Sequence, residues 1–490
     1  MMLAKGFANV KPNSLFSNNM VLQRGVEVPV WGRADEGEKV TVEFNGQKVS
    51  TVTKDGKWMV KLKELKASDK PSLMTIYGNN TIKIENILVG EVWVCSGQSN
   101  MDMTMSSAWP KHIINWEEEI AAANYPLIRQ FHVAHKASDT LVTDAKTSWI
   151  ICDTLSVKDY SAVGYFFAKN LFKSMKVPIG LLFSAYSGTP AEKWTSRGCL
   201  ESNDLLKPCI AEQNNAQKKY LEELKIFKSK KDSLMAKWKD DSLAASISNK
   251  AIPNKPKAPW SSEGVASSLY NGMINPLIPF AIKGVIWYQG EGNSRNAKRY
   301  QTLFPAMIND WRANWHQDQF PFLFVQMAPY YNMMPDIREA QLLTLNKVSN
   351  TSMAVITDCG DSLAIHPAQK QQVGYRLSLS ARAIAYKENI EYSGPLYKGF
   401  EVKGNTIEIS FTHIGKGLLA KDGELIGFTI AGEDKKFISA KAVISGDKIK
   451  VSSSSISNPV AARYGWSNYP VVNLFNADGL PASPFRTDVE

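Results

Sequence analysis

The sequence predicts an α/β protein whose doubly wound, mainly parallel sheet is flanked along the chain by two β-rich regions. Three observations carry this prediction. Residues 1–88 form short alternating runs broken by turn residues, residues 89–395 alternate apolar strand-like runs with helical patterns, and alternating strands return over residues 396–490. The length of 490 residues agrees with about three domains.

The N-terminal region, residues 1–88, is predicted to be a small β-sandwich. Apolar and polar residues alternate over Val26–Trp31, Lys39–Phe44 and Lys57–Leu62, which is the pattern of strands with one face in water. Asn45-Gly46 and Asp55-Gly56 are residue pairs that favour two-residue hairpin turns, because both positions of such a turn need positive φ. We therefore expect a hairpin at each pair.

The central region, residues 89–395, contains apolar runs of the kind found in a parallel sheet that helices cover on both faces. The predicted strands are Glu91–Cys95, Ile179–Phe183, Gly284–Tyr288, Phe322–Gln326 and Met353–Thr357. Apolar residues recur at helical spacing from Tyr300 to Trp315 and from Val373 to Ile384. This alternation of strand and helix predicts a doubly wound core.

A charged helical insertion at about residues 205–260 interrupts the alternation. Tyr220, Leu224 and Phe227 form an apolar stripe among many Lys, Glu and Asp, and Ala251–Pro259 contains three prolines. We expect a helix followed by a loop at the rim of the sheet. The insertion either forms one wall of a substrate cleft or is a surface feature without a part in the reaction.

The C-terminal region, residues 396–490, is predicted to be β-rich. Thr406–Thr412 and Lys448–Ser452 alternate cleanly, and Ser445-Gly446-Asp447 supplies a turn. One arrangement open to this region is to pack against the N-terminal sandwich and complete it.

The formal charge of +10, from 57 basic and 47 acidic residues, points in principle to an anionic partner. The lysines are spread thinly, however, with their densest run at Lys218–Lys239, and no Arg-rich run or zinc-finger spacing is present. We therefore expect no nucleic acid partner. No stretch of about 18 apolar residues predicts a membrane span.

The five cysteines are scattered and include no CxxC pair, so neither a structural zinc site nor a thioredoxin-like site is expected. A disulfide between Cys199 and Cys209 stays open, because spacing alone does not assign it. No cofactor is expected.

Ser99 is the first candidate for chemistry. It lies in Val92–Met101, where an apolar strand runs into Gly97-Gln-Ser-Asn. The carboxyl end of a central strand is where open α/β sheets bind ligands, and N–H groups at a following helix start can stabilise an oxyanion. Ser99 is therefore either a nucleophile or simply the cap of the next helix.

His366 is the candidate general base. It follows the apolar run Met353–Thr357 and precedes a helix, which places it on a loop at the same edge of the sheet as Ser99. The chain has six histidines, and few others compete for this role. An early serine and a late histidine at strand ends match the logic of a nucleophile and its base. The alternative is a solvated loop histidine without a role.

Two further strand ends offer hydrogen-bond donors. Ile179–Phe183 leads into Ser187-Gly188-Thr189, and Gly284–Tyr288 leads into Gln289-Gly290-Glu291. Backbone N–H groups and an amide side chain outside the sheet suit an oxyanion hole. Plain turns would explain the glycines equally well.

Together these segments resemble the sialate O-acetylesterase family, which belongs to the SGNH hydrolase superfamily. The resemblance rests on Gly97-Gln-Ser-Asn-Met, Gly188-Thr-Pro-Ala-Glu-Lys-Trp-Thr-Ser, Trp287-Tyr-Gln-Gly-Glu and Ile365-His-Pro, and it extends to Leu15–Arg24, Arg338–Gln341 and Gly479–Asp488. It covers nearly the whole chain, and the combination is specific although each piece is short.

The resemblance implies an SGNH-like catalytic domain at residues 89–395 that hydrolyses esters with a serine and without a metal. Ser99 would be the nucleophile and His366 the general base. The N–H groups of Ser99 and Gly188 and the side chain of Gln289 would form the oxyanion hole. Gln289 would stand where many superfamily members carry asparagine. Glu291 has no assigned role beyond holding its loop together.

The acid of the triad departs from the family pattern. The superfamily usually carries it three residues before the histidine and relatives of this protein often two before, and these positions are Leu363 and Ala364 here. Asp361 is then the first candidate to orient His366, and Asp358 the second. A Ser–His dyad helped by a backbone carbonyl is the alternative.

The function that these residues imply is a carbohydrate O-acetylesterase acting on O-acetylated sialic acid, its 9-O-acetyl ester included. An esterase of acetylated xylan or another acetylated polysaccharide is the main alternative, and a sugar-binding protein without activity the second. A sialic acid carboxylate would need an Arg nearby, and Arg197 and Arg463 are the candidates because they lie in family-like segments.

The family resemblance implies a periplasmic or secreted protein whose signal peptide is absent from this chain, with a cytoplasmic location as the alternative. The oligomeric state stays open.

Overall fold

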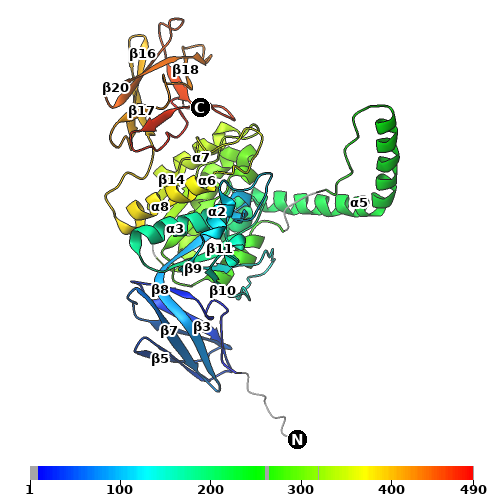
Figure 1. The fold of residues 1–490 in the computed structure, drawn as a ribbon, viewed down its shortest axis with the longest axis vertical. Coiled ribbons are helices and arrows are strands. Elements are labelled where there is room, and N and C mark those ends of the chain that lie inside the picture. The colour runs from blue at the N-terminus through cyan, green and yellow to red at the C-terminus, as the bar shows by residue number, and fades with distance from the viewer. Residues whose placement is uncertain (1–8, 260–263, 318, 489–490) are drawn as a thin grey trace.

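The computed structural model describes residues 9–259, 264–317 and 319–488. It shows a mixed α/β protein with three parts in a row (Figure 1). A β-rich N-terminal part lies at one end, an α/β core lies in the middle, and a second β-rich part lies at the other end. Within the described ranges, no helix is both long and apolar enough to cross a membrane.

The N-terminal part is a set of short strands that leads into the core. They are β1 (Lys11–Pro12), β2 (Val21–Gln23), β3 (Val28–Arg33), β4 (Lys39–Phe44), β5 (Gln47–Val52), β6 (Lys57–Leu62) and β7 (Ser68–Tyr77). In the β4–β5 hairpin Phe44 pairs with Gln47, so Asn45 and Gly46 alone form the turn, with φ of 45° and 77°. These are the positive φ values that the Asn-Gly pair predicts.

One sheet carries the core, with strands in the order β10-β9-β11-β8-β12-β13-β14. Their bounds are β8 (Thr81–Gly97), β9 (Tyr125–His132), β10 (Trp149–Cys152), β11 (Ile179–Ala185), β12 (Gly284–Tyr288), β13 (Phe322–Val325) and β14 (Thr351–Ala354). Neighbours along this order are parallel except β10 and β9. The first half of β8 pairs with β7 and the second half with β11 and β12, so the N-terminal part and the core share a strand.

Helices pack beside this sheet. They are α1 (Ser99–Asp102), α2 (Trp116–Ala121), α3 (Ala162–Met175), α4 (Arg197–Glu201), α6 (Ala297–Trp315), α7 (Pro335–Lys347) and α8 (Lys370–Tyr386). α3 packs against α8, and α6 packs against α7. The apolar residues of α6 that the helical spacing selects, Tyr300, Phe304 and Trp311 among them, are buried.

Helix α5 (Pro208–Ile247) projects from the core (Figure 1). Of its residues only Cys209 and Ile210, in the first turn, are fully buried. The predicted stripe at residues 220, 224 and 227 is half-buried. The chain after the helix folds back on it, because Nε1 of Trp238 donates a hydrogen bond to the carbonyl oxygen of Pro253 at 2.8 Å.

The C-terminal part has strands and a hydrophobic cluster of its own. Its strands are β15 (Leu396–Lys403), β16 (Thr406–Thr412), β17 (Leu418–Ala420), β18 (Phe428–Ala431), β19 (Ile438–Ser439), β20 (Lys441–Ser445), β21 (Lys448–Ser452), β22 (Ala461–Tyr464), β23 (Leu474–Asn476) and β24 (Phe485–Arg486). They form sheets in the orders β15-β16-β21-β20 and β19-β18-β22-β24, and β17 pairs with β23.

The expected packing of the two β-rich parts against each other is wrong. Figure 1 places them at opposite ends of the molecule, with the core between them. The C-terminal part is attached to the core instead, since the guanidinium of Arg486 donates hydrogen bonds of 2.7 and 3.0 Å to Glu339 of α7. Alternation along a strand tells which face is buried but not what covers it.

The N-terminal part and the core are filled by one hydrophobic cluster. Phe16 lies at their junction, with its ring centroid 4.8 Å from that of Trp31 and 5.6 Å from that of Phe280. Such aromatic pairs add about 0.5–1.5 kcal/mol beyond the burial of their area. These contacts stabilise the docking of the N-terminal part on the core.

All five cysteines are free thiols, so the disulfide between Cys199 and Cys209 does not form. Sγ of Cys199, in α4, lies 3.7 Å from the carbonyl oxygen of Ala306. Sγ of Cys209, in α5, lies 3.8 Å from a carboxylate oxygen of Glu192.

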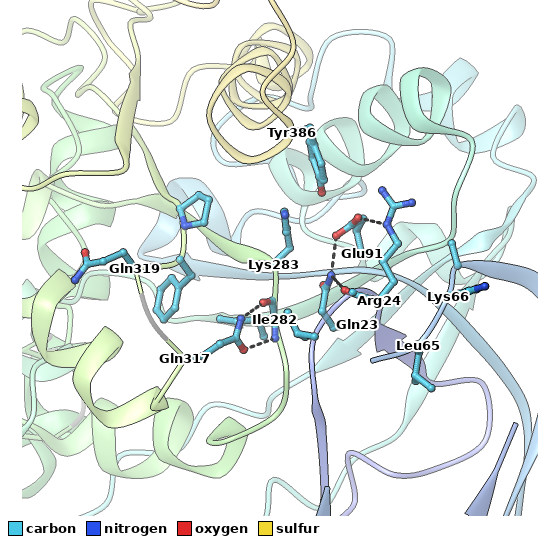
Figure 2. Close-up of a pocket in the computed structure, with 15 residues that line it drawn as sticks. Gln23, Arg24, Leu65, Lys66, Glu91, Ile282, Lys283, Gln317, Gln319 and Tyr386 are labelled. Carbon is cyan, nitrogen blue, oxygen red and sulfur yellow. Dashed lines mark hydrogen bonds and ion pairs between the residues drawn. The ribbon is translucent and has the colours of Figure 1, made fainter. Parts of the chain in front are cut away.

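A cavity of about 700 Å³ lies at the seam between the N-terminal part and the core (Figure 2). In its wall the carboxylate of Glu91 accepts hydrogen bonds from Nε of Arg24 at 2.5 Å and from Nε2 of Gln23 at 2.9 Å. Glu91 begins the core half of β8, and at about 3.3 Å per residue the carboxyl end of that strand is roughly 20 Å away. The cavity is therefore remote from the strand ends that carry the candidate catalytic residues.

Candidate active site

The candidate residues follow the carboxyl ends of strands in the core sheet. These ends lie side by side because the strands are in register. Gly97 at the end of β8 pairs with Ala185 of β11 and Tyr288 of β12. The segments that contain Ser99 and Gly188 follow directly. The structure thus brings together strand ends that are about 90 residues apart in sequence.

Ser99 is the first residue of α1, directly beyond a turn that needs glycine. Gly97 has φ of 140°, and a Cβ there would lie 2.2 Å from the carbonyl oxygen of Tyr288. The cap position belongs to Gln98, so the alternative role of Ser99 as the helix cap is excluded. Ser99 is 7% exposed, and no described residue hydrogen-bonds to its Oγ or its backbone N–H. Both groups are thus available to a ligand.

Gly188 is held next to α1 by its neighbour. Ser187 donates hydrogen bonds from its backbone N and its Oγ to Oδ2 of Asp102, at 3.1 and 2.7 Å. Asp102 is the last residue of α1. Gly188 itself has φ of 71°, and no acceptor in the described part of the chain takes its N–H. The loop therefore presents a backbone donor beside the helix that Ser99 begins.

Gln289 follows β12 and is completely buried, but its amide hydrogens are already used. Nε2 donates to the carbonyl oxygen of Thr189 at 3.2 Å and to Oδ1 of Asn293 at 2.7 Å, while Oε1 accepts from the hydroxyl of Tyr300 at 3.0 Å. The side chain links the loop after β11 to the loop after β12. It does not offer the oxyanion donor that the family resemblance implies.

His366 lies on the loop between β14 and α8, partly covered by Trp109. Their ring centroids are 5.9 Å apart, and Trp109 is still 40% exposed. Burial, and secondarily the positive charge of Lys370, lower the pKa of His366 to about 4. The imidazole is therefore neutral near pH 7 and able to accept a proton. Nothing in the sequence marks Trp109 as a candidate site residue except that it is aromatic.

Both candidate acids are held by groups other than His366. Asp361 accepts hydrogen bonds from the backbone N of Leu363 at 2.9 Å and forms an ion pair of 3.0 Å with Lys111. Asp358 accepts two hydrogen bonds of 2.6 Å from Arg376. Among the described residues, no carboxylate hydrogen-bonds to His366.

The two candidate arginines have carboxylate partners of their own. Arg197, in α4, pairs with Glu201 one helical turn later at 2.6 Å. Arg463 lies in β22 of the C-terminal part, where it pairs with Asp488 at 2.5 Å and stacks 3.8 Å from the ring centroid of Phe437. Neither forms an ion pair or hydrogen bond with Ser99 or its surroundings. In the ranges that the structure describes, no three His, Cys, Asp or Glu side chains are grouped to hold a metal ion.

Asn100 and Glu291, which lie within the recognised motifs, and Lys370, which does not, form a buried network. Asn100 donates from Nδ2 to Oε1 of Glu291 at 2.5 Å and to the carbonyl oxygen of Ile365 at 3.0 Å, and its Oδ1 accepts from Nζ of Lys370 at 2.5 Å. Lys370 gave no sequence signal, because a lysine at a helix start is normally solvated. Glu291 does hold its loop, by joining it to α1.

Comparison with known families shows which family the chain belongs to. The sequence model of the family described as "Carbohydrate esterase, sialic acid-specific acetylesterase" matches residues 89–237 and 251–382, which is more than half of the chain. The chain belongs to this family. It is a carbohydrate esterase, as the motifs predict. The match contains every residue of the network and breaks only within and just beyond the outer end of α5.

Individual proteins resemble the chain over nearly its full length. The sialate O-acetylesterase of Rattus norvegicus is 32% identical over 97% of this chain and 94% of its own, and that of Homo sapiens is 29% identical over 96% and 91%. The crystal structure of a carbohydrate acetylesterase from Xanthomonas citri superposes with a TM-score of 0.82 at 32% identity, over 98% of this chain and all of the other. These likenesses confirm the family resemblance of the motifs.

Proposed function

We propose that this esterase removes O-acetyl groups from sialic acid through an acetyl-enzyme on Ser99. One observation carries the proposal: the 3.0 Å hydrogen bond from Nδ2 of Asn100 to the carbonyl oxygen of Ile365. Asn100 follows Ser99 and Ile365 precedes His366, so this bond joins the nucleophile segment to the base segment. The names of the mammalian relatives support the sugar.

In the first step Oγ of Ser99 attacks the acetyl carbonyl carbon while His366 takes the hydroxyl proton. The N–H groups of Ser99 and Gly188 stabilise the oxyanion. The tetrahedral intermediate then breaks its bond to the sugar oxygen, which leaves with the proton from His366. In the second step His366 removes a proton from water as the water attacks acetyl-Ser99. Acetate leaves and the Ser99 hydroxyl takes the proton back.

His366 acts here as the base of a Ser–His dyad rather than of a triad. Asp361 instead fixes the loop, because its carboxylate binds Lys111 and two backbone N–H groups of that loop. Gln289 supports the oxyanion hole because its Nε2 donates a hydrogen bond to the carbonyl oxygen of Thr189, the residue after Gly188.

Trp109 is proposed to receive an apolar face of the sugar. It is the large exposed side chain whose ring lies beside His366, and aromatic faces bind the C–H groups of sugars by stacking.

The test is acetate release from O-acetylated sialic acid by the wild type and by Ser99→Ala. Loss of the nucleophile should lower kcat by about 10⁴-fold or more. A folded Ser99→Ala enzyme that releases acetate at the wild-type rate sinks the mechanism.

Deacetylation of a neutral polysaccharide such as acetylated xylan is the second candidate function. It is favoured by the ion pairs of Arg197 and Arg463, since both arginines are already neutralised by carboxylates. The ratio of kcat/KM on O-acetylated sialic acid to that on acetylated xylan distinguishes the two substrates.

We also propose that the core, residues 89–395, has the doubly wound arrangement of SGNH hydrolases, between an N-terminal domain at 1–88 and a C-terminal domain at 396–490. The placement of Ser99, Gly188, Gln289 and His366 after β8, β11, β12 and β14 of one sheet supports this assignment.

A further inference from the structure

Lys370, the first residue of α8, is completely buried. Lysine is almost never fully buried unless it is paired, because removing an ammonium group from water is costly. Its Nζ donates a hydrogen bond of 2.5 Å to Oδ1 of Asn100 and lies 5.4 Å from the ring centroid of Tyr288. These few contacts do not by themselves account for the burial of a lysine, whereas a role at the active site would.

The partners of Asn100 fix the orientation of its amide. An ammonium group only donates, so Oδ1 must face Lys370, while the carboxylate of Glu291 and the carbonyl of Ile365 accept and must face Nδ2. One amide thereby joins the Ser99 helix, the loop after β12, the start of α8 and the residue before His366. Without Lys370, Oδ1 of this amide loses its hydrogen-bond donor.

We propose that Lys370 is a positioning residue that, through Asn100, holds Ser99 and His366 in their reacting geometry. The inference rests on the proposed function of Ser99 and His366 and deepens it. The ammonium that donates to Asn100 is also a positive charge near His366, where it opposes protonation of the imidazole as the second cause after burial.

The electrostatics of the surroundings agree with this role. Burial lowers the pKa of Lys370 to about 7, and the negative charge of Glu291 opposes that shift. The titratable groups that face Lys370 are Glu291, Tyr288, Cys359 and His366. Burial raises the pKa of Glu291 and that of Cys359.

The experiment compares Lys370→Met with Lys387→Met, which changes an exposed lysine at the other end of the same helix. Methionine keeps an unbranched apolar chain one atom shorter and removes both the charge and the donor. We expect Lys370→Met to lower kcat by about 10- to 100-fold, because reacting groups that move by about 1 Å lose that much. The acid midpoint of kcat/KM should rise by roughly one pH unit, since removing a like charge raises the pKa of His366. Lys387→Met should change neither.

A folded Lys370→Met enzyme that keeps its wild-type kcat, or whose acid midpoint does not rise, overturns the inference. A merely structural lysine would change the folded fraction without moving that midpoint. If Lys370→Met does not fold, Asn100→Ala carries the test, because it removes the bridge and leaves the ammonium. It should lower kcat at least about tenfold, and a wild-type kcat contradicts the proposal.

A double-mutant cycle tests whether Lys370 acts through Asn100. Lys370→Met with Asn100→Ala should cost little more in kcat than the worse single variant, and additive losses contradict the bridge. Ser99→Ala separates this inference from the proposed function. If Ser99→Ala is inactive while Lys370→Met behaves as wild type, only the role of Lys370 fails. If Ser99→Ala is fully active, the proposed function fails.

Discussion

Nδ2 of Asn100 lies 3.0 Å from the carbonyl oxygen of Ile365, across 265 residues of sequence. This hydrogen bond ties the residue after Ser99 to the residue before His366. In the proposed Ser–His dyad, this amide would align the two segments without a carboxylate bound to His366.

The pH dependence of the reaction should reflect the low pKa of His366. A base must be neutral to accept the Ser99 proton, so kcat/KM should rise with pH through about 4 and level off below the pKa of about 7 of Lys370. Burial is the first cause of the low value and the charge of Lys370 the second. Initial rates over pH 3 to about 8 on a stable folded sample measure this. An acid midpoint above about 6 would show that His366 has its ordinary pKa or a raised one.

Asp361→Asn should change kcat/KM by less than about tenfold. Its carboxylate binds Lys111 and the backbone of the loop rather than His366, whereas removing the acid of a true triad costs about 10⁴-fold. Asp361→Asn is measured beside His366→Gln, which removes the base and should lose nearly all activity. A loss for Asp361→Asn that approaches that of His366→Gln restores Asp361 as the triad acid.

Gln289→Ala should lower stability as well as activity. It removes the buried hydrogen bonds of the Gln289 side chain to Thr189, Asn293 and Tyr300, at about 1–3 kcal/mol. Urea unfolding followed by fluorescence measures that change. If the free energy of unfolding is unchanged while kcat falls about 10²- to 10³-fold, Gln289 is instead a direct oxyanion donor.

Trp109→Ala should raise KM for the acetylated sugar by roughly threefold to tenfold. It should leave hydrolysis of p-nitrophenyl acetate unchanged, because that substrate has no sugar to stack. Tyr469→Ala is the matched control, since Tyr469 is an exposed aromatic residue of the C-terminal part. Equal effects of Trp109→Ala on both substrates would place the tryptophan in the chemistry rather than in sugar binding.

Glu91→Ala should destabilise the protein while leaving kcat unchanged. Glu91 is 2% exposed and holds Arg24 and Gln23 at the seam of Figure 2, about 20 Å along β8 from its carboxyl end. Arg24 is partly exposed and can recover water, so the expected loss is about 1–3 kcal/mol rather than that of a fully buried pair. A large fall in kcat at unchanged stability would connect the seam to the active site.

Local patterns predicted the regular elements well. Alternation and turn residues predicted the observed bounds of β4 and β6, a continuous apolar run predicted those of β12, and helical spacing found α6. β9 and β10 were missed, because Arg129, Gln130 and His132 make β9 look polar although Arg129 and Gln130 are buried. The hydrogen bonds that satisfy such groups form only in the folded chain.

The candidate residues that lie in sequence motifs could be predicted. The features that depend on contacts between distant segments could not. Ser99, Gly188 and His366 stand at strand ends that the sequence already marks. The bond of Gln289 to Thr189 and the bond of the buried Lys370 to Asn100 join segments far apart in the chain.

The most direct test of the account is covalent labelling of the nucleophile. The wild type, treated with a serine-directed phosphonate and digested, should lose activity as one label appears on the peptide that contains Ser99. The Ser99→Ala variant should take up none. Label on a different residue, or full inhibition without any label at Ser99, would contradict the acetyl-enzyme mechanism.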